Sequence, residues 1–235
     1  MLGKPTYAIV LDRDNARALS LRHMFSVICG ETCEVYSSVE AFFDHVSTDV
    51  SPQVILVGDI PDRADAVKAI ADAIPGFLIA IEQSDGDLSV EDAFLQGADD
   101  VLRVPYTLRE LALRLRARIG LLGSSENDNL FLDATHWGDE AYISERAGLT
   151  ESEAHIVHVL MKHSGKIVSR DALSLEIDGR AWDYGDRKFD VHVAKIRKKL
   201  TSTFGDNISV QTVRSAGYIL SIDEIGQAEL AENQI

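Results

Sequence analysis

Residues 186–200 read Asp-Arg-Lys-Phe-Asp-Val-His-Val-Ala-Lys-Ile-Arg-Lys-Lys-Leu and are the most informative stretch of this chain. At 3.6 residues per turn, a helix here has one apolar face and one basic face. The apolar face holds Phe189, Val193, Ile196 and Leu200, and Arg187, Val191, Lys195 and Lys198 lie on or near the opposite face. Arginine and lysine can bond guanine edges, and valine can contact a thymine methyl group. The pattern predicts a helix that offers its basic face to a DNA groove; a solvated cationic surface is the alternative.

Charge is distributed unevenly along the chain. The 235 residues carry a formal net charge of −15, which by itself argues against a nucleic acid partner. Residues 1–120 hold 11 Lys and Arg against 19 Asp and Glu, whereas residues 149–222 hold 11 against nine. Residues 187–199 hold six cations and one anion, Asp190. This distribution indicates a DNA-binding domain attached to an acidic domain.

Short apolar runs alternate with amphipathic stretches across residues 1–122. The expected strands are Tyr7–Leu11, Cys33–Tyr36, Gln53–Val57, Phe77–Ile81 and Val101–Val104. The expected helices are Asn15–Cys29, Val39–Val46, Ala64–Ile74, Val90–Leu95 and Leu108–Leu122. Strands that alternate with helices favour a parallel sheet covered on both faces. We therefore predict an α/β domain with the flavodoxin-like doubly wound (βα)5 fold, whose sites lie at the carboxyl ends of the strands.

A polar, turn-rich segment at residues 123–129 predicts a linker, followed by a second domain over residues 130–225 and an acidic tail over 226–235. Leu130–Leu132 and Ala141–Ile143 are expected to form a small antiparallel sheet. Three helices should follow, with Thr150 capping the first in a capping box with Glu153. A hairpin over residues 208–213 and 218–222 completes the outline of a winged helix-turn-helix domain.

Four segments of the second domain closely resemble the OmpR/PhoB family of bacterial response regulators. Residues 186–200 resemble its recognition helix, and Gln-Thr-Val-Arg-Ser-Ala-Gly-Tyr at 211–218 resembles its wing. Leu149–Glu153 and Lys166–Arg170 are similar to the openings of its first two helices. The resemblance covers residues 130–222 and implies a transcription regulator that binds double-stranded DNA.

The residues that the resemblance assigns to DNA are Arg187, Lys188, Val191, His192, Lys195, Arg197, Lys198 and Arg214. It implies phosphate contacts from Arg187 and His192. Val191 and Lys195 would contact base edges, with the later cations of the helix beside them. Arg214, at the tip of the wing, would enter the minor groove.

This chain departs from the family at two points of the DNA-binding region. Ala194 and Lys195 stand where a pair of arginines is common, and lysine lacks the bidentate fork of arginine. Ser215 replaces the first glycine of the wing. Residues 178–186 match the family segment that can contact RNA polymerase; a plain connecting loop is the alternative.

The first domain is similar to the receiver domain of the same family. The resemblance implies a phosphoacceptor aspartate after the third strand, two acids that hold Mg²⁺ after the first, a hydroxyl after the fourth and a lysine after the fifth. At these positions the chain has Gly58, Asp12 with Arg13, Glu82 and Val104, and Asp59 lies one residue beyond the acceptor position.

Only Asp12 keeps the expected residue type. Arg13 opposes a metal ion by charge repulsion and could pair with Asp12 or Asp59. Val104 cannot make the charge-assisted bond of a lysine to a phosphoryl oxygen. We expect a degenerate pocket with no metal and no other cofactor. The alternative is a bulge that brings Asp59 into the acceptor position.

Charged residues late in the first domain match the face through which active receivers of the family pair. Asp100 and Arg114 match one bridging pair, and Glu110 matches an anion whose partner, expected near Val90, is missing. Because surface ion pairs are weak, apolar residues would have to supply most of such a dimer.

We therefore predict a non-enzymatic transcription regulator whose receiver-like domain is a homodimerisation module that acts without phosphorylation. Two alternatives are a conventional switch phosphorylated at Asp59 and an interaction protein for which DNA binding is secondary. The chain lacks a long apolar run and a signal-peptide pattern, so we expect a cytoplasmic protein without membrane contact. Cys29 and Cys33 are expected to be thiols in a reducing compartment.

Overall fold

The computed structural model describes residues 6–45, 51–83, 88–119 and 137–232. The chain divides into two compact units, Met1–Leu132 and Asp133–Gln234. The linker expected at residues 123–129 and the strand expected at Leu130–Leu132 lie outside the described residues.

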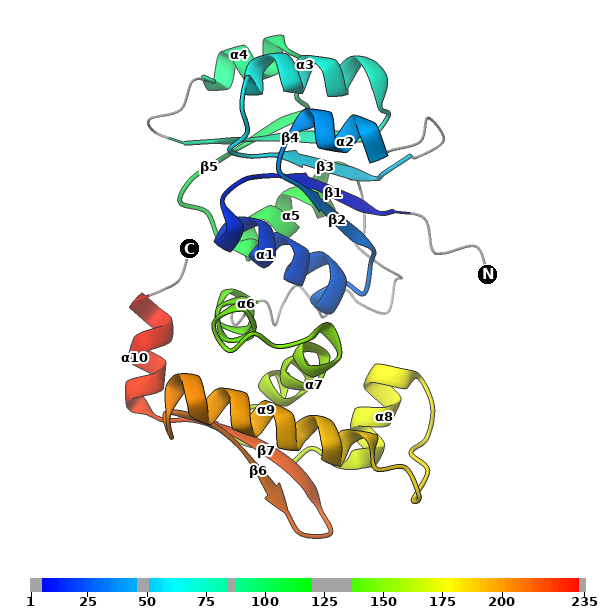
Figure 1. The fold of residues 1–235 in the computed structure, drawn as a ribbon, viewed down its shortest axis with the longest axis vertical. Coiled ribbons are helices and arrows are strands. Elements are labelled where there is room, and N and C mark those ends of the chain that lie inside the picture. Colours follow the sequence, from blue (N-terminus) through cyan, green and yellow to red (C-terminus); the bar gives the residue numbers. More distant parts are fainter. Residues whose placement is uncertain (1–5, 46–50, 84–87, 120–136, 233–235) are drawn as a thin grey trace. The chain divides into compact units, whose positions relative to one another are not determined.

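The first unit contains a five-stranded parallel sheet (Figure 1). Its strands are β1 (Ala8–Leu11), β2 (Cys33–Tyr36), β3 (Val54–Val57), β4 (Phe77–Glu82) and β5 (Asp100–Arg103), in the order β2-β1-β3-β4-β5. Every residue of β1 and β3 is buried, as the continuous apolar runs predict for central parallel strands. The strand order is that of the flavodoxin-like doubly wound fold, so the predicted fold class is confirmed.

Five helices connect and cover these strands. They are α1 (Asn15–His23), α2 (Val39–His45), α3 (Arg63–Ala73), α4 (Val90–Leu95) and α5 (Leu108–Ile119). Within this unit, α2, α3 and α4 lie on one side of the sheet and α1 and α5 on the other (Figure 1). The helix expected to run without interruption over 15–29 instead ends at His23 and continues as a π-helical turn, η1 (Met24–Ile28).

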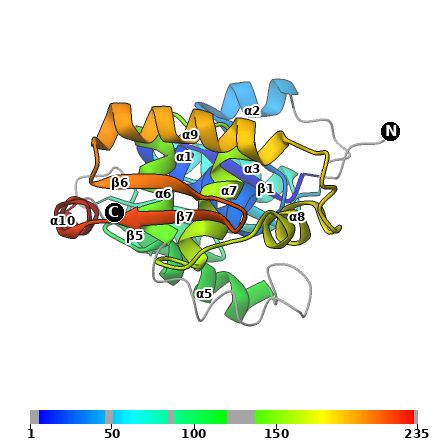
Figure 2. The same ribbon diagram turned by 90° about the horizontal axis from the view of Figure 1, so that it is seen from below.

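The second unit is a winged helix domain. It consists of α6 (Trp137–Arg146), α7 (Glu151–Lys162), α8 (Arg170–Asp178), α9 (Lys188–Phe204), strands β6 (Ile208–Val213) and β7 (Gly217–Ile222), and α10 (Glu224–Glu232). The four apolar residues predicted for one face of α9 are all buried in the core of this unit. The two strands form an antiparallel hairpin that lies beside α9 (Figure 2). The capping box of Thr150 and Glu153 at the start of α7 is also present.

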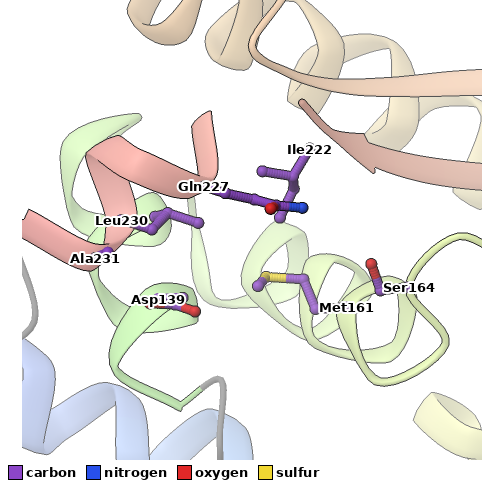
Figure 3. Close-up of a pocket in the computed structure, with 7 residues that line it drawn as sticks. All are labelled: Asp139, Met161, Ser164, Ile222, Gln227, Leu230 and Ala231. Carbon is purple, nitrogen blue, oxygen red and sulfur yellow. The ribbon is translucent and has the colours of Figure 1, made fainter. Parts of the chain in front are cut away.

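Two expectations for this unit require correction. Ala141–Ile143 is not a strand but part of α6, because Trp137, Ala141 and Ser144 are buried at helical spacing. A run of three apolar residues is too short to show that period. Residues 226–232, expected to belong to a tail beyond the domain, lie in α10. Its Leu230 belongs to the core and faces a pocket of about 370 Å³ that Met161 also lines (Figure 3).

Both cysteines are thiols, as expected. Burial raises the pKa of Cys29 and of Cys33 to about 12, and nearby acidic side chains add to the rise. Since the thiolate is the reactive form, these cysteines are poor nucleophiles. Cys29 is buried in the first unit, and Cys33 is partly buried.

Candidate nucleic-acid interface and receiver pocket

The outer face of α9 carries the side chains predicted to read DNA. Arg187, Lys195 and Lys198 are exposed, and 53% of Val191 is exposed. Lys195 and Lys198 form no ion pair with any described residue. The two faces of the helix are therefore segregated as the periodicity of the sequence indicates, with the apolar side in the core and the cations in solvent.

Three cations of the same basic run are held by protein groups. The Arg197 guanidinium donates from Nε to the carbonyl oxygen of Val210 at 2.9 Å and from Nη2 to Oγ1 of Thr212 at 2.9 Å. Lys188 pairs with Asp178. These two residues were assigned to DNA from the sequence; in the structure, Arg197 joins α9 to β6, and Lys188 joins α9 to the end of α8.

Lys199 is the third of these cations. Its Nζ donates to Oε2 of Glu153 at 2.7 Å and to the carbonyl oxygen of Gly148 at 2.7 Å. Glu153 is buried, and burial raises the pKa of its carboxyl. The hydrogen bonds from Lys199 and Thr150 outweigh that effect, so the pKa lies below its usual value. The pair anchors α9 to the start of α7.

A hydrogen-bonded cluster joins α9 to α8 and to β7. Oδ1 of Asp190 accepts from Nη2 of Arg170 at 2.6 Å and from the Tyr218 hydroxyl at 2.5 Å. These two bonds hold the pKa of Asp190 below its ordinary value. The guanidinium carbon of Arg170 lies 4.8 Å from the centre of the Tyr218 ring. Sequence reasoning missed this cluster, although an anion inside a basic helix was a signal that it had a structural partner.

The remaining residues that the sequence singled out lie in the turn of the wing, on α9 and in the loop before α9. Arg214 is exposed in the turn between β6 and β7, and Ser215 adopts a left-handed conformation with φ of 59°. Although Ser215 replaces a glycine of the family pattern, its backbone keeps the left-handed conformation that glycine favours. His192 is half-buried on α9. In the loop, 90% of Tyr184 is exposed, and Nε1 of Trp182 donates to the carbonyl oxygen of Asp186 at 3.1 Å.

At the carboxyl edge of the parallel sheet, the Asp12 carboxylate is paired with Arg17, a residue that the sequence did not single out. Arg17 donates from Nε to Oδ2 of Asp12 at 2.5 Å and from Nη2 to Oδ1 at 2.8 Å. Oδ1 also accepts from the backbone N–H of Asp14 at 2.9 Å and of Asp59 at 3.2 Å. A cation in the first turn of a helix opposes the helix dipole. That unfavourable placement of Arg17 was the signal that it has an acidic partner.

Gly58 and Asp59 lie opposite Asp12 at the end of β3. A Cβ atom at Gly58 would lie 2.0 Å from Oδ2 of Asp12, so the Asp12 carboxylate occupies the space that a side chain at 58 would need. Asp59 turns away and pairs with Arg13, with 3.4 Å between Nη2 and Oδ1. The sequence left two partners open for Arg13, and this geometry selects Asp59.

The last residues of β4 and β5 form a different ion pair. Oε2 of Glu82 accepts from Nε of Arg103 at 2.6 Å. The next residue, Val104, is linked to Glu82 only through the backbone, where its N–H donates to the Glu82 carbonyl oxygen at 2.9 Å. An acid that is paired with Arg103 thus stands where the resemblance implies a hydroxyl, and the uncharged Val104 stands where it implies a lysine.

These residues do not fit the Mg²⁺ site that the resemblance implies. Both oxygens of Asp12 are engaged by Arg17, the acceptor position has no side chain, and Arg13 adds a second cation. Within the described residues, no group of three His, Cys, Asp or Glu side chains is arranged to hold a metal ion.

The three charged residues predicted for a dimer face are bonded to one another. Nη1 of Arg114 lies 3.3 Å from Oδ2 of Asp100, and Nη2 lies 2.9 Å from Oε1 of Glu110. Large apolar side chains are exposed on α4 and α5, including Leu95, of which 81% is exposed, and Leu113. No helix in the described ranges is long and apolar enough to cross a membrane.

The comparisons with known proteins agree with this architecture. Residues 144–220 match the family described as "Transcriptional regulatory protein, C terminal". The chain is 34% identical over 134 residues to the "Transcriptional regulatory protein CpxR homolog" of Haemophilus influenzae, which covers 53% of this chain and 59% of that relative. It is 26% identical over 182 residues to the "Heme response regulator HssR" of Staphylococcus epidermidis, covering 75% and 80%.

Among solved structures, the receiver domain of the TMAO respiratory system response regulator TorR is similar to 49% of this chain and 97% of its own, with 20% identity and a TM-score of 0.44. The first-named relative is matched over little more than half of its length. The matched C-terminal family, the relatives and the order of the two domains together support the resemblance of the chain to response regulators of the OmpR/PhoB type.

Proposed function

We propose that this chain is a sequence-specific transcription regulator that binds double-stranded DNA in the cytoplasm through its winged helix domain. The observation that carries the proposal is the outer face of α9, where Arg187, Val191 and Lys195 are exposed on a helix anchored by its buried side. Arg187 and His192 would contact phosphates, and Val191 and Lys195 would contact base edges. Lys198 would lie beside them, and Arg214 would reach the minor groove.

We further propose that Arg197 and Lys188 act at this interface mainly by holding the helix in place. Their charged groups already bond to β6 and to Asp178. Such cations contribute to the electrostatic attraction of DNA without reading a base.

The receiver-like domain is proposed to act without phosphorylation. Asp59 points to Arg13 at the sheet edge, and the space of the acceptor side chain is filled by Asp12. Phosphoryl transfer needs a metal ion and donors that neutralise the developing charge. The arrangement of Asp12, Arg13 and Gly58 supports neither.

Its role would be to bring two winged domains together as a homodimer. The proposed face combines Asp100, Glu110 and Arg114 with the exposed Leu95 and Leu113. Arg114→Glu would place three carboxylates together and should shift the protein towards monomer, weakening DNA binding with it. Sedimentation of a wild-type monomer at tens of micromolar, a range set by the affinity scale, would contradict this role.

The loop over residues 178–186 is proposed as a contact for RNA polymerase. Its support is the exposure of Tyr184, which lies beside Trp182 with 5.4 Å between ring centres. Aromatic side chains exposed on loops are common at protein interfaces. Tyr184→Ala should reduce transcription from a bound promoter while leaving DNA affinity unchanged; an equal loss of both would contradict a separate polymerase contact.

The function as a whole is tested with the full chain and its mapped genomic sites. Electrophoretic shift should show salt-dependent binding to those duplexes and weaker binding to unrelated ones. Acetyl phosphate or beryllofluoride with Mg²⁺ should change neither the mass, the oligomeric state nor the DNA affinity. Stoichiometric, Mg²⁺-dependent phosphorylation of Asp59 with tighter DNA binding would show a conventional switch instead.

A further inference from the structure

Arg17 is a permanent positive charge buried in the receiver pocket. Its side chain is 7% exposed, and the side chain of its partner Asp12 is 0% exposed. Arginine is almost never buried unless it is paired, because removing its charge from water is costly. The contacts of its guanidinium must therefore offset that cost.

Each nitrogen of the Arg17 guanidinium has a partner. Nε and Nη2 form the bidentate pair with Asp12, and Nη1 lies 3.3 Å from Oδ2 of Asp14. With the Gln83 amide turned so that its oxygen faces donors, that oxygen accepts from Nη2 at 2.9 Å and from Nη1 at 3.2 Å. Arg17 thus connects the end of β1, the start of α1 and the segment after β4.

Most of the negative charge around this position is already compensated by the chain itself, because three arginines pair with four acids. The acids at this edge of the sheet are Asp12, Asp14, Asp59 and Glu82, and the paired cations are Arg13, Arg17 and Arg103. A divalent cation is normally drawn to such a site by uncompensated carboxylates. Here, three guanidinium groups supply the positive charge instead.

We propose that Arg17 is a resident cation that takes the place of a divalent metal ion at the carboxyl edge of the sheet. It neutralises Asp12 and holds the segments after β1 and β4 in one arrangement. This inference rests on the proposed phosphorylation-independent function and gives it a physical cause. It also implies a latent cation site: without the guanidinium, the buried carboxylate of Asp12 and the oxygens of Asp14 and Gln83 would surround a space suited to Mg²⁺ or Mn²⁺.

The test is urea unfolding of the full chain with and without Mg²⁺ or Mn²⁺, comparing the wild type, Arg17→Met and the control Arg103→Met. Unfolding of the first unit is measured by hydrogen exchange of the β1 and β3 peptides. Tryptophan fluorescence would report only the second unit, which contains both Trp137 and Trp182. Arg103→Met removes a pair at the same edge whose arginine side chain is 73% exposed.

We expect the metal ions to leave the wild type and Arg103→Met unchanged. Arg17→Met should unfold at a urea concentration lower by about 1–2 M, since it leaves a buried carboxylate uncompensated. Metal should restore part of that loss. Stabilisation of the wild type by Mg²⁺, or wild-type stability of Arg17→Met with no response to metal, would overturn the proposal.

A second variant covers the case in which Arg17→Met does not fold. Asp12→Asn with Arg17→Met removes both charges and should recover most of the stability while remaining indifferent to metal. If the double variant is as unstable as the single one, Arg17 acts through packing, and the inference fails. Phosphorylation of wild-type Asp59 would defeat the proposed function itself, whereas failed metal rescue in an unphosphorylated protein defeats only this inference.

Discussion

In the receiver domain, Arg17 is buried against Asp12. In the winged helix domain, Arg187 at the start of α9 and Lys195 on α9 are exposed to solvent. Both regions are rich in cations, but their partners differ. At the sheet edge, arginines of the same chain pair with the carboxylates, so an external cation or phosphoryl group finds little uncompensated charge. On α9, the cations that matter for the proposed function have no ion-pair partner among the described residues. A polyanion such as DNA can supply the missing charge.

Helix α9 contains both kinds of cation, those bonded within the chain and those exposed to solvent. Arg197 and Lys199 are used to hold the helix against β6 and α7, and Lys195 and Lys198 point outward. The lesson is that a run of basic residues is not one binding surface. Tertiary contacts divide it into anchoring cations and cations available to a ligand.

The largest expected effect comes from restoring an acidic side chain at the acceptor position. In Gly58→Asp, the new side chain must enter the space that the Asp12 carboxylate occupies. Asp12 cannot move away easily, because it is hydrogen-bonded to Arg17. We expect a loss of about 3 kcal/mol or more of unfolding free energy, from overpacking and from an added buried charge. Urea unfolding followed by hydrogen exchange of β1 measures it. A variant as stable as the wild type that accepts phosphate from acetyl phosphate would show that the pocket can open.

The next effect concerns the outward cations of α9. Lys195→Ala should cost about 1–3 kcal/mol of binding free energy on the specific site and relax sequence selectivity. Arg187→Ala should weaken binding to all duplexes similarly and flatten the salt dependence by about one unit of slope. Titrations on specific and unrelated duplexes separate the two outcomes. If both variants keep the wild-type affinity and salt dependence, the groove assignment is wrong.

A smaller effect on stability is expected for the ion pair between Lys199 and Glu153, which anchors α9 to α7. Because the pKa of Glu153 is lower in the folded protein than when unfolded, its stabilising contribution is present above the unfolded value of about 4.3. The contribution is lost as the pH falls through the folded value. Glu153→Gln should therefore cost about 1–2 kcal/mol at neutral pH and less in acid.

Tryptophan fluorescence during urea unfolding follows this change, since both tryptophans lie in the second unit. Glu151→Gln, at an exposed position of the same first turn, is the matched control and should show little effect at either pH. A loss that is the same at both pH values would mean that Glu153 acts by packing rather than by charge.

The smallest effect is expected in the wing. Ser215→Gly removes the cost of a left-handed serine but makes the unfolded chain more flexible, so the net gain should be under about 1 kcal/mol. Ala216→Gly, at the next residue of the turn, should be neutral or destabilising. Unfolding of both variants by urea decides this, and a clear loss in Ser215→Gly would show that the serine side chain supports the turn.

The sequence by itself determined the elements with a strong period. The alternation of apolar runs and amphipathic stretches predicted the parallel sheet, and the spacing from Phe189 to Leu200 predicted which face of α9 is buried. Periodicity reports the direction in which a side chain faces its local core, which is a local property of the chain. It fails for short runs, and Ala141–Ile143 was misassigned for that reason.

Only the tertiary structure decided the partner of each charge. The sequence did not connect Asp12 with Arg17, and it grouped Arg197 with Lys198 as a cation beside the base contacts. The structure pairs Arg17 with Asp12 and bonds Arg197 to β6. Gly58 appeared to be a missing acceptor, but its lack of a side chain makes room for the Asp12 carboxylate. Pairing depends on the distance and burial of residues that different elements bring together. A one-dimensional pattern of charges does not contain that information.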